Sequence, residues 1–363
     1  MLIRRTSLIF LVLLFTRPLF AQMKKPVADY TKADELALTV KSNGDINKLT
    51  ADLTNTFTEP VLKARAIFRW ITENITYDYK YFNKYYIGGK DPKSFSCQGD
   101  SVGCSIKKNA WINDIINNTL SDKKGVCQGY SLLFKKMCNI VGIEAEFVPG
   151  YVRTDPYQIG TPGSLSHAWN TVKLNGVSYL LDVTWAAGGC RNDENGKLIS
   201  FEKHYKDYYW LTPADEFARN HFPLDAKWVL LPNYTLAMFA LNPYYPPIEI
   251  GNVKLIAPVS GVITAKRGDT IRFKMNYVSN VNKVQINSNI FRNPDVWIYA
   301  ENNNHQRIRM PDSMAIKRQQ YIAYKHEGES YAFNYVVKDY TLDYLEILFD
   351  NRQIMRFKVR VAR

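Results

Sequence analysis

The chain has 363 residues, of which 46% are hydrophobic, and a formal net charge of +13. This length suffices for two domains with proper cores, and the Lys and Arg residues are scattered without a nucleic-acid-binding motif, so we expect a solvated basic surface and no nucleic-acid partner. The sequence contains no Cys-x-x-Cys pair, His-Glu-x-x-His, EF-hand loop, Walker loop or Gly-x-Ser-x-Gly elbow, so we expect neither a metal site nor a cofactor.

The first predicted element is an export signal over residues 1–21. Arg4 and Arg5 give it a positive start, residues 8–15 form its apolar run, and Ala21 lies at a plausible cleavage site. The apolar run has eight residues, whereas a helix needs about 20 to cross a bilayer. No later segment is long and apolar enough either. The sequence therefore predicts a secreted or periplasmic protein without a transmembrane anchor.

From residue 22 to residue 248 the pattern indicates helices followed by strands. Residues 28–74 are expected to be helical, because apolar side chains recur there at helical spacing. Residues 78–109 are polar and rich in Tyr, Lys, Gly and Ser, and we interpret them as a loop or insertion. A second helix begins near Cys127 and ends at Gly142, where a glycine cap is expected. Together these segments predict an α+β domain over residues 22–248.

The hairpin signal Asn175-Gly176 lies between two predicted strands of this domain. If these two residues form the turn, His167 faces Thr184, and His167 and Asp182 are diagonal neighbours on one sheet face, about 7–8 Å apart. The opposite face is apolar and is expected to be the core. An Asp182 carboxylate could hold one imidazole nitrogen and leave the other free to act. A surface His–Asp pair without a role is the alternative interpretation.

After residue 248 the pattern changes to short alternating runs separated by turns. This pattern predicts an all-β sandwich, resembling an immunoglobulin-like domain, over residues 249–363. The sandwich is a plausible binding domain. The sequence thus predicts two folded domains after the signal.

The tripeptide Cys-Gln-Gly occurs twice, beginning at Cys97 and at Cys127. Cys127 begins the second helix, where unpaired backbone N–H groups and the helix dipole stabilise a thiolate. Gly125 and Gly129 are expected to leave space for a substrate backbone. Cys97 has no amphipathic helix after it, and its nearest partner is Cys104. We therefore predict that Cys127 is the reactive cysteine.

Five cysteines in an exported chain allow at most two disulfides. We predict a disulfide between Cys97 and Cys104, because they lie seven positions apart in a Gly- and Ser-bearing segment. Cys138 follows Cys127 on the same helix at about 16 Å, and a disulfide needs Cα atoms within about 7 Å. We expect Cys138 to be buried and Cys190 to be a free thiol.

Four ordered stretches between about residues 60 and 232 carry a family resemblance: AIFRWITENITYDY, GVCQGYSLLFKKMCNIVGIEA, SHAWNTVKLNGVSYLLDVTW and YYWLTPADEFARNHFPLDAKWVLL. They resemble the transglutaminase-like superfamily, in particular the branch that includes kyphoscoliosis peptidase and exported bacterial proteins. The resemblance implies a papain-like core in which Cys127, His167 and Asp182 are catalytic. It also implies thiol chemistry on Gln side-chain or peptide amides.

Two further positions bear on this resemblance. The backbone N–H of Cys127 can supply one oxyanion-hole donor, and Trp111 and Asn113 are candidates for the other. His221, in the stretch NHFP, matches a family position and is expected to have a packing role.

The predicted function is an exported cysteine protease or amidase, or a crosslinking transglutaminase. Cys127 would attack an amide carbonyl to form a thioester, which water or an amine would resolve. Export into a wet compartment favours hydrolysis. The partner is expected to be a protein or peptide substrate, and the cell envelope is one expected source of it. Two alternatives stay open, namely a catalytically silent scaffold that binds protein or envelope partners, and polyanion binding through the basic surface.

Overall fold

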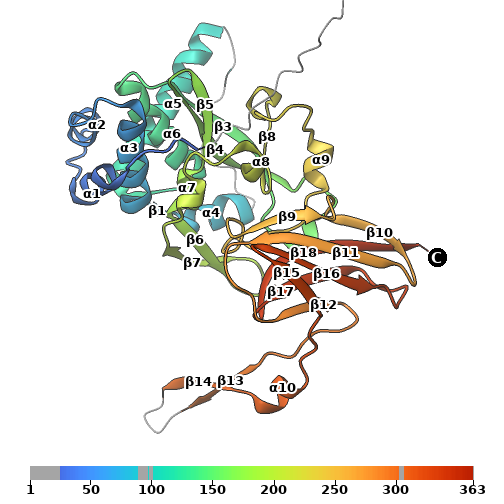
Figure 1. The fold of residues 1–363 in the computed structure, drawn as a ribbon. Coiled ribbons are helices and arrows are strands. Elements are labelled where there is room, and N and C mark those ends of the chain that lie inside the picture. Colours follow the sequence, from blue (N-terminus) through green and yellow to red (C-terminus); the bar gives the residue numbers. More distant parts are fainter. Residues whose placement is uncertain (1–24, 89–96, 98–100, 302–305, 363) are drawn as a thin grey trace, which may run out of the picture.

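The computed structural model describes residues 25–88, 97, 101–301 and 306–362 (Figure 1). Helices dominate the first part of the chain and strands dominate the last part, so the predicted α+β class with a C-terminal β-sandwich is confirmed. The predicted export signal lies outside the described residues. Among the helices that are described, none has the length and apolar character needed to cross a membrane.

Four helices surround the core of the N-terminal domain. They are α1 (Thr31–Thr39), α2 (Ile46–Thr54), α3 (Pro60–Asn74) and α6 (Cys127–Ile140). Helix α3 begins with Pro60, whose fixed φ and missing N–H suit the first helical position. Its predicted apolar stripe is buried, with Ile67, Trp70 and Ile71 fully inaccessible. Helix α3 packs against α6, and both helices contribute buried side chains to the same core.

Residues 78–109 were predicted to form a loop. Of the residues in this range that the structure describes, most are helical, so the prediction is wrong for them. The chain forms α4 (Tyr79–Phe82), a π-helical turn (Asn83–Ile87) and the 22-residue helix α5 (Ser101–Asp122). The buried side chains of α5 all lie in its C-terminal half, so its first half shows no apolar stripe in the sequence. The predicted Cys97–Cys104 disulfide is present and ties the chain to the first turn of α5.

A four-stranded antiparallel sheet, ordered β5-β4-β3-β8, packs against α6. Its strands are β3 (Ala145–Val152), β4 (Ser164–Leu174), β5 (Val177–Leu181) and β8 (His221–Pro223). The predicted hairpin register is confirmed from Leu174↔Val177 to Asn170↔Leu181. Asn175 and Gly176 form the turn with φ of 51° and 81°, the left-handed values that a type I′ turn requires.

The hairpin ends earlier than predicted. Strand β5 stops at Leu181, and residues 183–187 form the short helix α7 (Val183–Ala187), so Thr184 does not lie opposite His167. The cause is Asp182, whose side chain accepts the N–H groups of Thr184 and Trp185 and caps the helix. The sheet is also covered on both faces, since Trp169 on the His167 face is fully buried.

The smaller elements complete the N-terminal domain. They are the parallel pair β1 (Thr76–Tyr77) and β2 (Lys124–Gly125), the hairpin β6 (Gly188–Asn192) and β7 (Leu198–Lys203), and the helices α8 (Ala214–Phe217) and α9 (Leu236–Ala240).

The C-terminal sandwich consists of two four-stranded sheets, ordered β10-β18-β17-β12 and β15-β16-β11-β9. Its strands are β9 (Val253–Ala257), β10 (Val262–Lys266), β11 (Thr270–Tyr277), β12 (Val284–Ser288), β15 (Tyr324–Glu327), β16 (Ser330–Val336), β17 (Tyr344–Phe349) and β18 (Arg352–Ala362). Inward-facing Phe273, Ile347 and Phe357 belong to its own core. The Arg219 guanidinium joins the two domains by donating to the carbonyls of Ile250 and Val253 at 2.6 and 2.9 Å.

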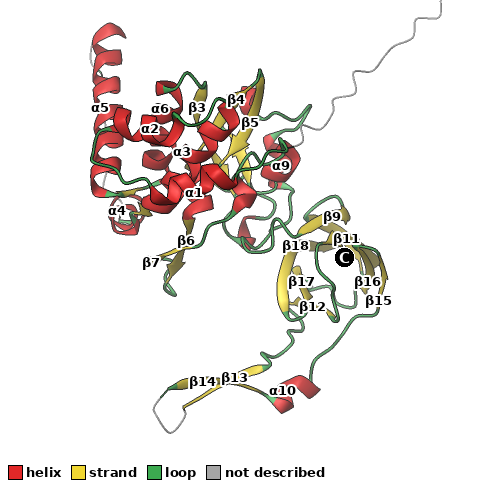
Figure 2. Ribbon diagram, turned by 60° about the vertical axis from the view of Figure 1, so that its left-hand side comes forward, coloured by secondary structure: helices red, strands yellow, loops and turns green. Residues whose placement is uncertain are grey.

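One segment projects from the sandwich. It comprises the hairpin β13 (Trp297–Glu301) and β14 (Arg307–Pro311) and the helix α10 (Ser313–Lys317). Figures 1 and 2 show this segment, which we call the arm, extending away from the N-terminal helices.

Candidate active site

Asp182 is fixed by its place between a strand and a helix. It is fully buried, and its Oδ1 accepts the backbone N–H groups of Thr184 and Trp185 at 2.8 and 3.0 Å. Burial alone would raise the pKa of this carboxyl, but the charge and hydrogen bonds of His167 and His221 outweigh burial and hold it well below its usual range. Asp182 is therefore an ionised carboxylate at neutral pH.

His167 lies against this carboxylate, as the sequence predicted. Its Nε2 donates to Asp182 Oδ2 at 2.7 Å, and its side chain is 7% exposed. Burial disfavours the charged ring, but the Asp182 charge and hydrogen bond outweigh it, with a smaller contribution from a hydrogen bond to Cys127, and raise the pKa of His167 to about 10. Because Asp182 occupies Nε2, Nδ1 is the nitrogen left for the Cys127 thiol.

Cys127 is the first residue of α6, and two hydrogen bonds tie this helix to the strand that carries His167. Ser131, one turn further along α6, donates to the carbonyl of Ala168 at 3.0 Å, and the Asn170 amide donates to the carbonyl of Ser131 at 2.9 Å. These bonds hold the start of α6 against β4, with Cys127 at the helix N-terminus, where the dipole favours negative charge.

The two glycines beside Cys127 line the cavity described below, and they also have a packing role. A Cβ on Gly129 would overlap the Thr119 hydroxyl, and a Cβ on Gly125 would lie 3.1 Å from the same side chain. Both glycines therefore allow α5 to pack closely against the start of α6. This close packing brings α5 and the start of α6 together as two walls of one cavity.

A cavity of about 930 Å³ opens beside Cys127, between α4, α5 and the start of α6. Val126 and Gln128 flank the cysteine in its wall, and its aromatic lining comes from Tyr81, Tyr85, Tyr86 and Trp111. Trp111, one of the two predicted oxyanion-hole candidates, lines this cavity, whereas Asn113 does not. The cavity has the size of an ordinary ligand site, and its wall includes the residues on either side of Cys127.

His221 has the expected packing role, since its buried ring stacks on Phe217 at 4.2 Å, and it also contacts the same carboxylate from a separate strand. Its Nε2 lies 3.1 Å from Asp182 Oδ2, and its Nδ1 lies 2.6 Å from the Asn220 side-chain amide. Burial lowers the pKa of His221 to about 4, so the ring is neutral and carries one proton. The ring has one proton, Nδ1 faces Asn220 Oδ1, and Nε2 faces the ionised Asp182, which is the stronger acceptor, so we infer that the proton is on Nε2.

Removing the His221 donor should weaken catalysis without touching the reacting atoms. We expect His221→Leu to lower kcat about tenfold, because one lost hydrogen bond of about 1.4 kcal/mol to the carboxylate leaves His167 less firmly oriented. His221→Gln, which retains an N–H donor, should restore part of the rate. Steady-state kinetics of both variants check this, with the exposed His204→Leu as the matched control. Equal rates for wild type and His221→Leu would contradict the positioning role.

His167, Asp182 and His221 also have the spacing of a metal site, with ligand atoms within 4.8 Å of one another. The two imidazole nitrogens lie 2.7 and 3.1 Å from one carboxylate oxygen, which are hydrogen-bond lengths, and Asp182 and His221 are buried. A metal ion bound by these three residues would have to break both hydrogen bonds to Asp182. We therefore interpret the cluster as a hydrogen-bond network that holds His167.

Comparison with known proteins connects this geometry to a family. Residues 47–185 match the model of the transglutaminase-like superfamily. Kyphoscoliosis peptidase from Mus musculus is 30% identical over 219 residues, which cover 60% of this chain and 29% of that protein. Hillarin from Drosophila melanogaster is 25% identical over 214 residues, which cover 56% and 23% of the two proteins. The chain therefore spans less than a third of the length of these curated relatives.

Among solved structures, a crystal structure of a TGase has a TM-score of 0.26 and 16% identity, and the match covers 43% of this chain and 32% of that chain.

Proposed function

Residues 47–185 form a domain of the transglutaminase-like superfamily, and from this premise we propose that the chain is a thiol enzyme that acts on amide bonds. The observation that carries the proposal is the placement of His167, which bonds the buried Asp182 at 2.7 Å and is near enough to Cys127 that this residue helps to raise the pKa of the ring. This is the order of nucleophile, base and orienting carboxylate that acyl transfer requires.

In the proposed reaction, Cys127 is a thiolate beside the protonated His167, and this thiolate attacks the carbonyl carbon of an amide. The backbone N–H of Cys127 lies at the unpaired start of α6 and can donate to the oxyanion. The C–N bond then breaks, His167 gives its proton to the leaving amine, and an S-acyl thioester remains on Cys127. Water or a second amine attacks the thioester, its proton passes to His167, and the C–S bond breaks.

The substrate is proposed to be a protein or peptide that the chain meets outside the cytoplasm. The Cys97–Cys104 disulfide supports this placement, because such bonds persist in oxidising compartments. The basic start and apolar run of residues 1–21 support it independently. Because water is abundant in such a compartment, we propose that hydrolysis of the thioester, and not amine transfer, is the main reaction.

Product analysis tests this choice. The purified chain is incubated with peptides that contain Gln and internal amide bonds, with and without an added primary amine, and the products are identified by mass spectrometry. We expect hydrolysis products in both reactions and few amine adducts. If amine adducts formed in place of hydrolysis products, the activity would be that of a transglutaminase. If no peptide of the panel gave a product or an acyl-enzyme, the thiol-enzyme proposal would be contradicted.

A further inference from the structure

The aromatic cavity beside Cys127 also has an acidic lining. Among the residues that the structure describes, three carboxylates line it, from Asp78, Asp114 and Asp122, and one cation, from Lys124. The chain as a whole has a formal net charge of +13, so the charge of this lining is opposite in sign to that of the protein. The cavity therefore favours a positively charged group more than the rest of the surface does.

Helix α5 presents two of these carboxylates on one face. Trp111, Ile115, Asn118 and Asp122 line the cavity at intervals of four, three and four residues, and Asp114 lies three residues after Trp111. Residues at these spacings are neighbours on the surface of a helix. The wall that α5 forms thus combines two carboxylates with an indole ring.

These two carboxylates are accessible and are not paired with a cation. Asp114 has no hydrogen bond or ion pair with any residue in the described part of the chain, and Asp122 accepts only the hydroxyl of its neighbour Ser121, at 3.0 Å. Both residues are exposed, so a ligand in the cavity can reach them. Asp78 differs, because its carboxylate accepts the backbone N–H of Tyr81 at 2.8 Å and caps α4.

Tyrosine rings from α4 and the π-helical turn form another wall. The rings of Tyr81 and Tyr85 lie 4.4 Å apart, and Tyr86 is 45% exposed. The ammonium group of Lys84 lies 4.9 Å from the centre of the Tyr85 ring, so this wall already attracts one cation of the chain itself. Aromatic faces and carboxylates therefore favour the same kind of ligand.

Tyr86 relates this cavity to the thiol. Burial, and then the charge of Cys127, raise the pKa of Tyr86 to about 12, and the second effect requires the phenol to lie near the sulfur. Val126 and Gln128, on either side of Cys127, belong to the wall of the same cavity. A peptide whose amide bond is held at Cys127 would therefore place its neighbouring side chains close to this lining.

We propose that this cavity binds a basic side chain, from a Lys or Arg that lies next to the amide bond attacked by Cys127. The ammonium or guanidinium group contacts the carboxylates of Asp114 and Asp122 and an aromatic face, and the apolar stem of the side chain packs along Ile115. This inference rests on the proposed function, because it assigns the cavity to the substrate. It narrows the substrate class to proteins and peptides with a basic residue beside the reacting amide.

Calorimetric titration of the full chain with the Cys127→Ala substitution tests the proposal in the absence of turnover. The probes are blocked alanine peptides that differ only at one central position, which is Lys, Arg, norleucine or Glu. We expect the Lys and Arg peptides to bind about tenfold more tightly than the norleucine peptide, because each exposed ion pair or cation–π contact strengthens binding about two- to fivefold. This preference should decrease as the salt concentration rises.

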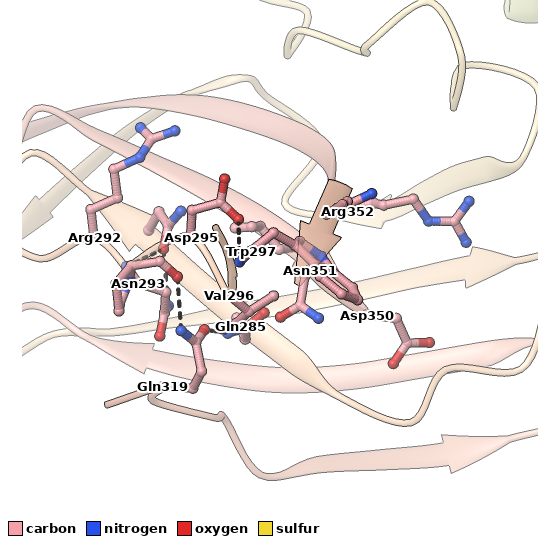
Figure 3. Close-up of a pocket in the computed structure, with 14 residues that line it drawn as sticks. Gln285, Arg292, Asn293, Asp295, Val296, Trp297, Gln319, Asp350, Asn351 and Arg352 are labelled. Carbon is pink, nitrogen blue, oxygen red and sulfur yellow. Dashed lines mark hydrogen bonds between the residues drawn. The ribbon is translucent and has the colours of Figure 1, made fainter. Parts of the chain in front are cut away.

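Substitutions in the lining should change the preference in opposite directions. Asp114→Asn and Asp122→Asn should each weaken binding of the Lys and Arg peptides about two- to fivefold and leave binding of the norleucine peptide unchanged. Lys124→Gln should strengthen it, because this change removes a like charge. The matched control is Asp295→Asn, since Asp295 is an exposed carboxylate that lines a separate cavity at the base of the arm (Figure 3). This control should bind every probe as the parent chain does.

The proposal is overturned if no probe binds, if the norleucine or Glu peptide binds as tightly as the Lys peptide, or if the preference survives the combined Asp114→Asn and Asp122→Asn changes. Binding of the Lys but not the Arg peptide would also overturn it, because a site for an attacking amine would then explain the result. Binding needs no thiol, so a basic preference in a chain without turnover would support this site and contradict only the thiol-enzyme proposal. Turnover without any charge preference would contradict only the present inference.

Discussion

The Cys127→Ala variant should lose all turnover of amide substrates while its fold stays intact. The alanine retains the helix and the packing of α6 but removes the sulfur that forms the thioester, and no other side chain in the described cleft can replace it. In enzymes with a comparable triad, loss of the nucleophile costs about 10⁶-fold in kcat. Steady-state assays on the substrate found by product analysis give the rate, and circular dichroism checks the fold.

Cys190→Ser is the matched control for this experiment. Cys190 is a second free thiol, partly exposed on strand β6, and it has no hydrogen bond to His167. Its replacement should leave turnover unchanged. If Cys127→Ala kept full activity and Cys190→Ser lost it, the nucleophile would be Cys190 and not Cys127.

Asp182→Asn should lower turnover by up to about 10⁴-fold, the loss seen when the carboxylate of a Ser-His-Asp triad becomes an amide. The asparagine retains the shape but removes the charge that outweighs the burial of His167. The pKa of His167, raised to about 10 by the carboxylate, should then fall. Because the catalytic imidazolium loses its proton at a lower pH in this variant, the alkaline decline of the pH–rate profile should move to lower pH.

The fold of this variant should survive, because the side-chain oxygen of the introduced asparagine could still accept the N–H groups of Thr184 and Trp185. Asp312→Asn is the matched control, since Asp312 caps α10 through two backbone N–H groups in the same way but lies in the arm. Thermal unfolding should show similar small shifts in Tm for both variants, and only Asp182→Asn should lose activity. An unchanged pH–rate profile in Asp182→Asn would exclude control of His167 by this carboxylate.

The sequence predicted the contact between His167 and Asp182 because short-range rules determine it. The Asn-Gly turn fixes the register of a two-stranded hairpin, and the register decides which residues share a face. The prediction remained correct although β5 ends one residue before Asp182. An aspartate followed by residues that can begin a helix is also an N-cap signal, so the start of α7 could have been read from the same segment.

The sequence did not predict the role of His221, because that role depends on a long-range contact. His221 lies 39 residues after Asp182 and reaches it only because β8 pairs with β3. No local pattern encodes this pairing. Helix α5 was missed for a different reason, since its exposed first half buries no apolar side chain, so hydrophobic periodicity could not reveal it.

Covalent trapping of the folded chain by a peptide electrophile that mimics an amide tests the central proposal most directly. Peptide mapping by mass spectrometry locates and counts the adduct in the wild type and in the His167→Gln and Cys190→Ser variants. We expect one adduct, on Cys127, which forms slowly in His167→Gln and at the normal rate in Cys190→Ser. An adduct on Cys190 alone, or a Cys127 that stays unmodified in the folded wild-type chain, would contradict the assignment of Cys127 and His167 as a reactive pair.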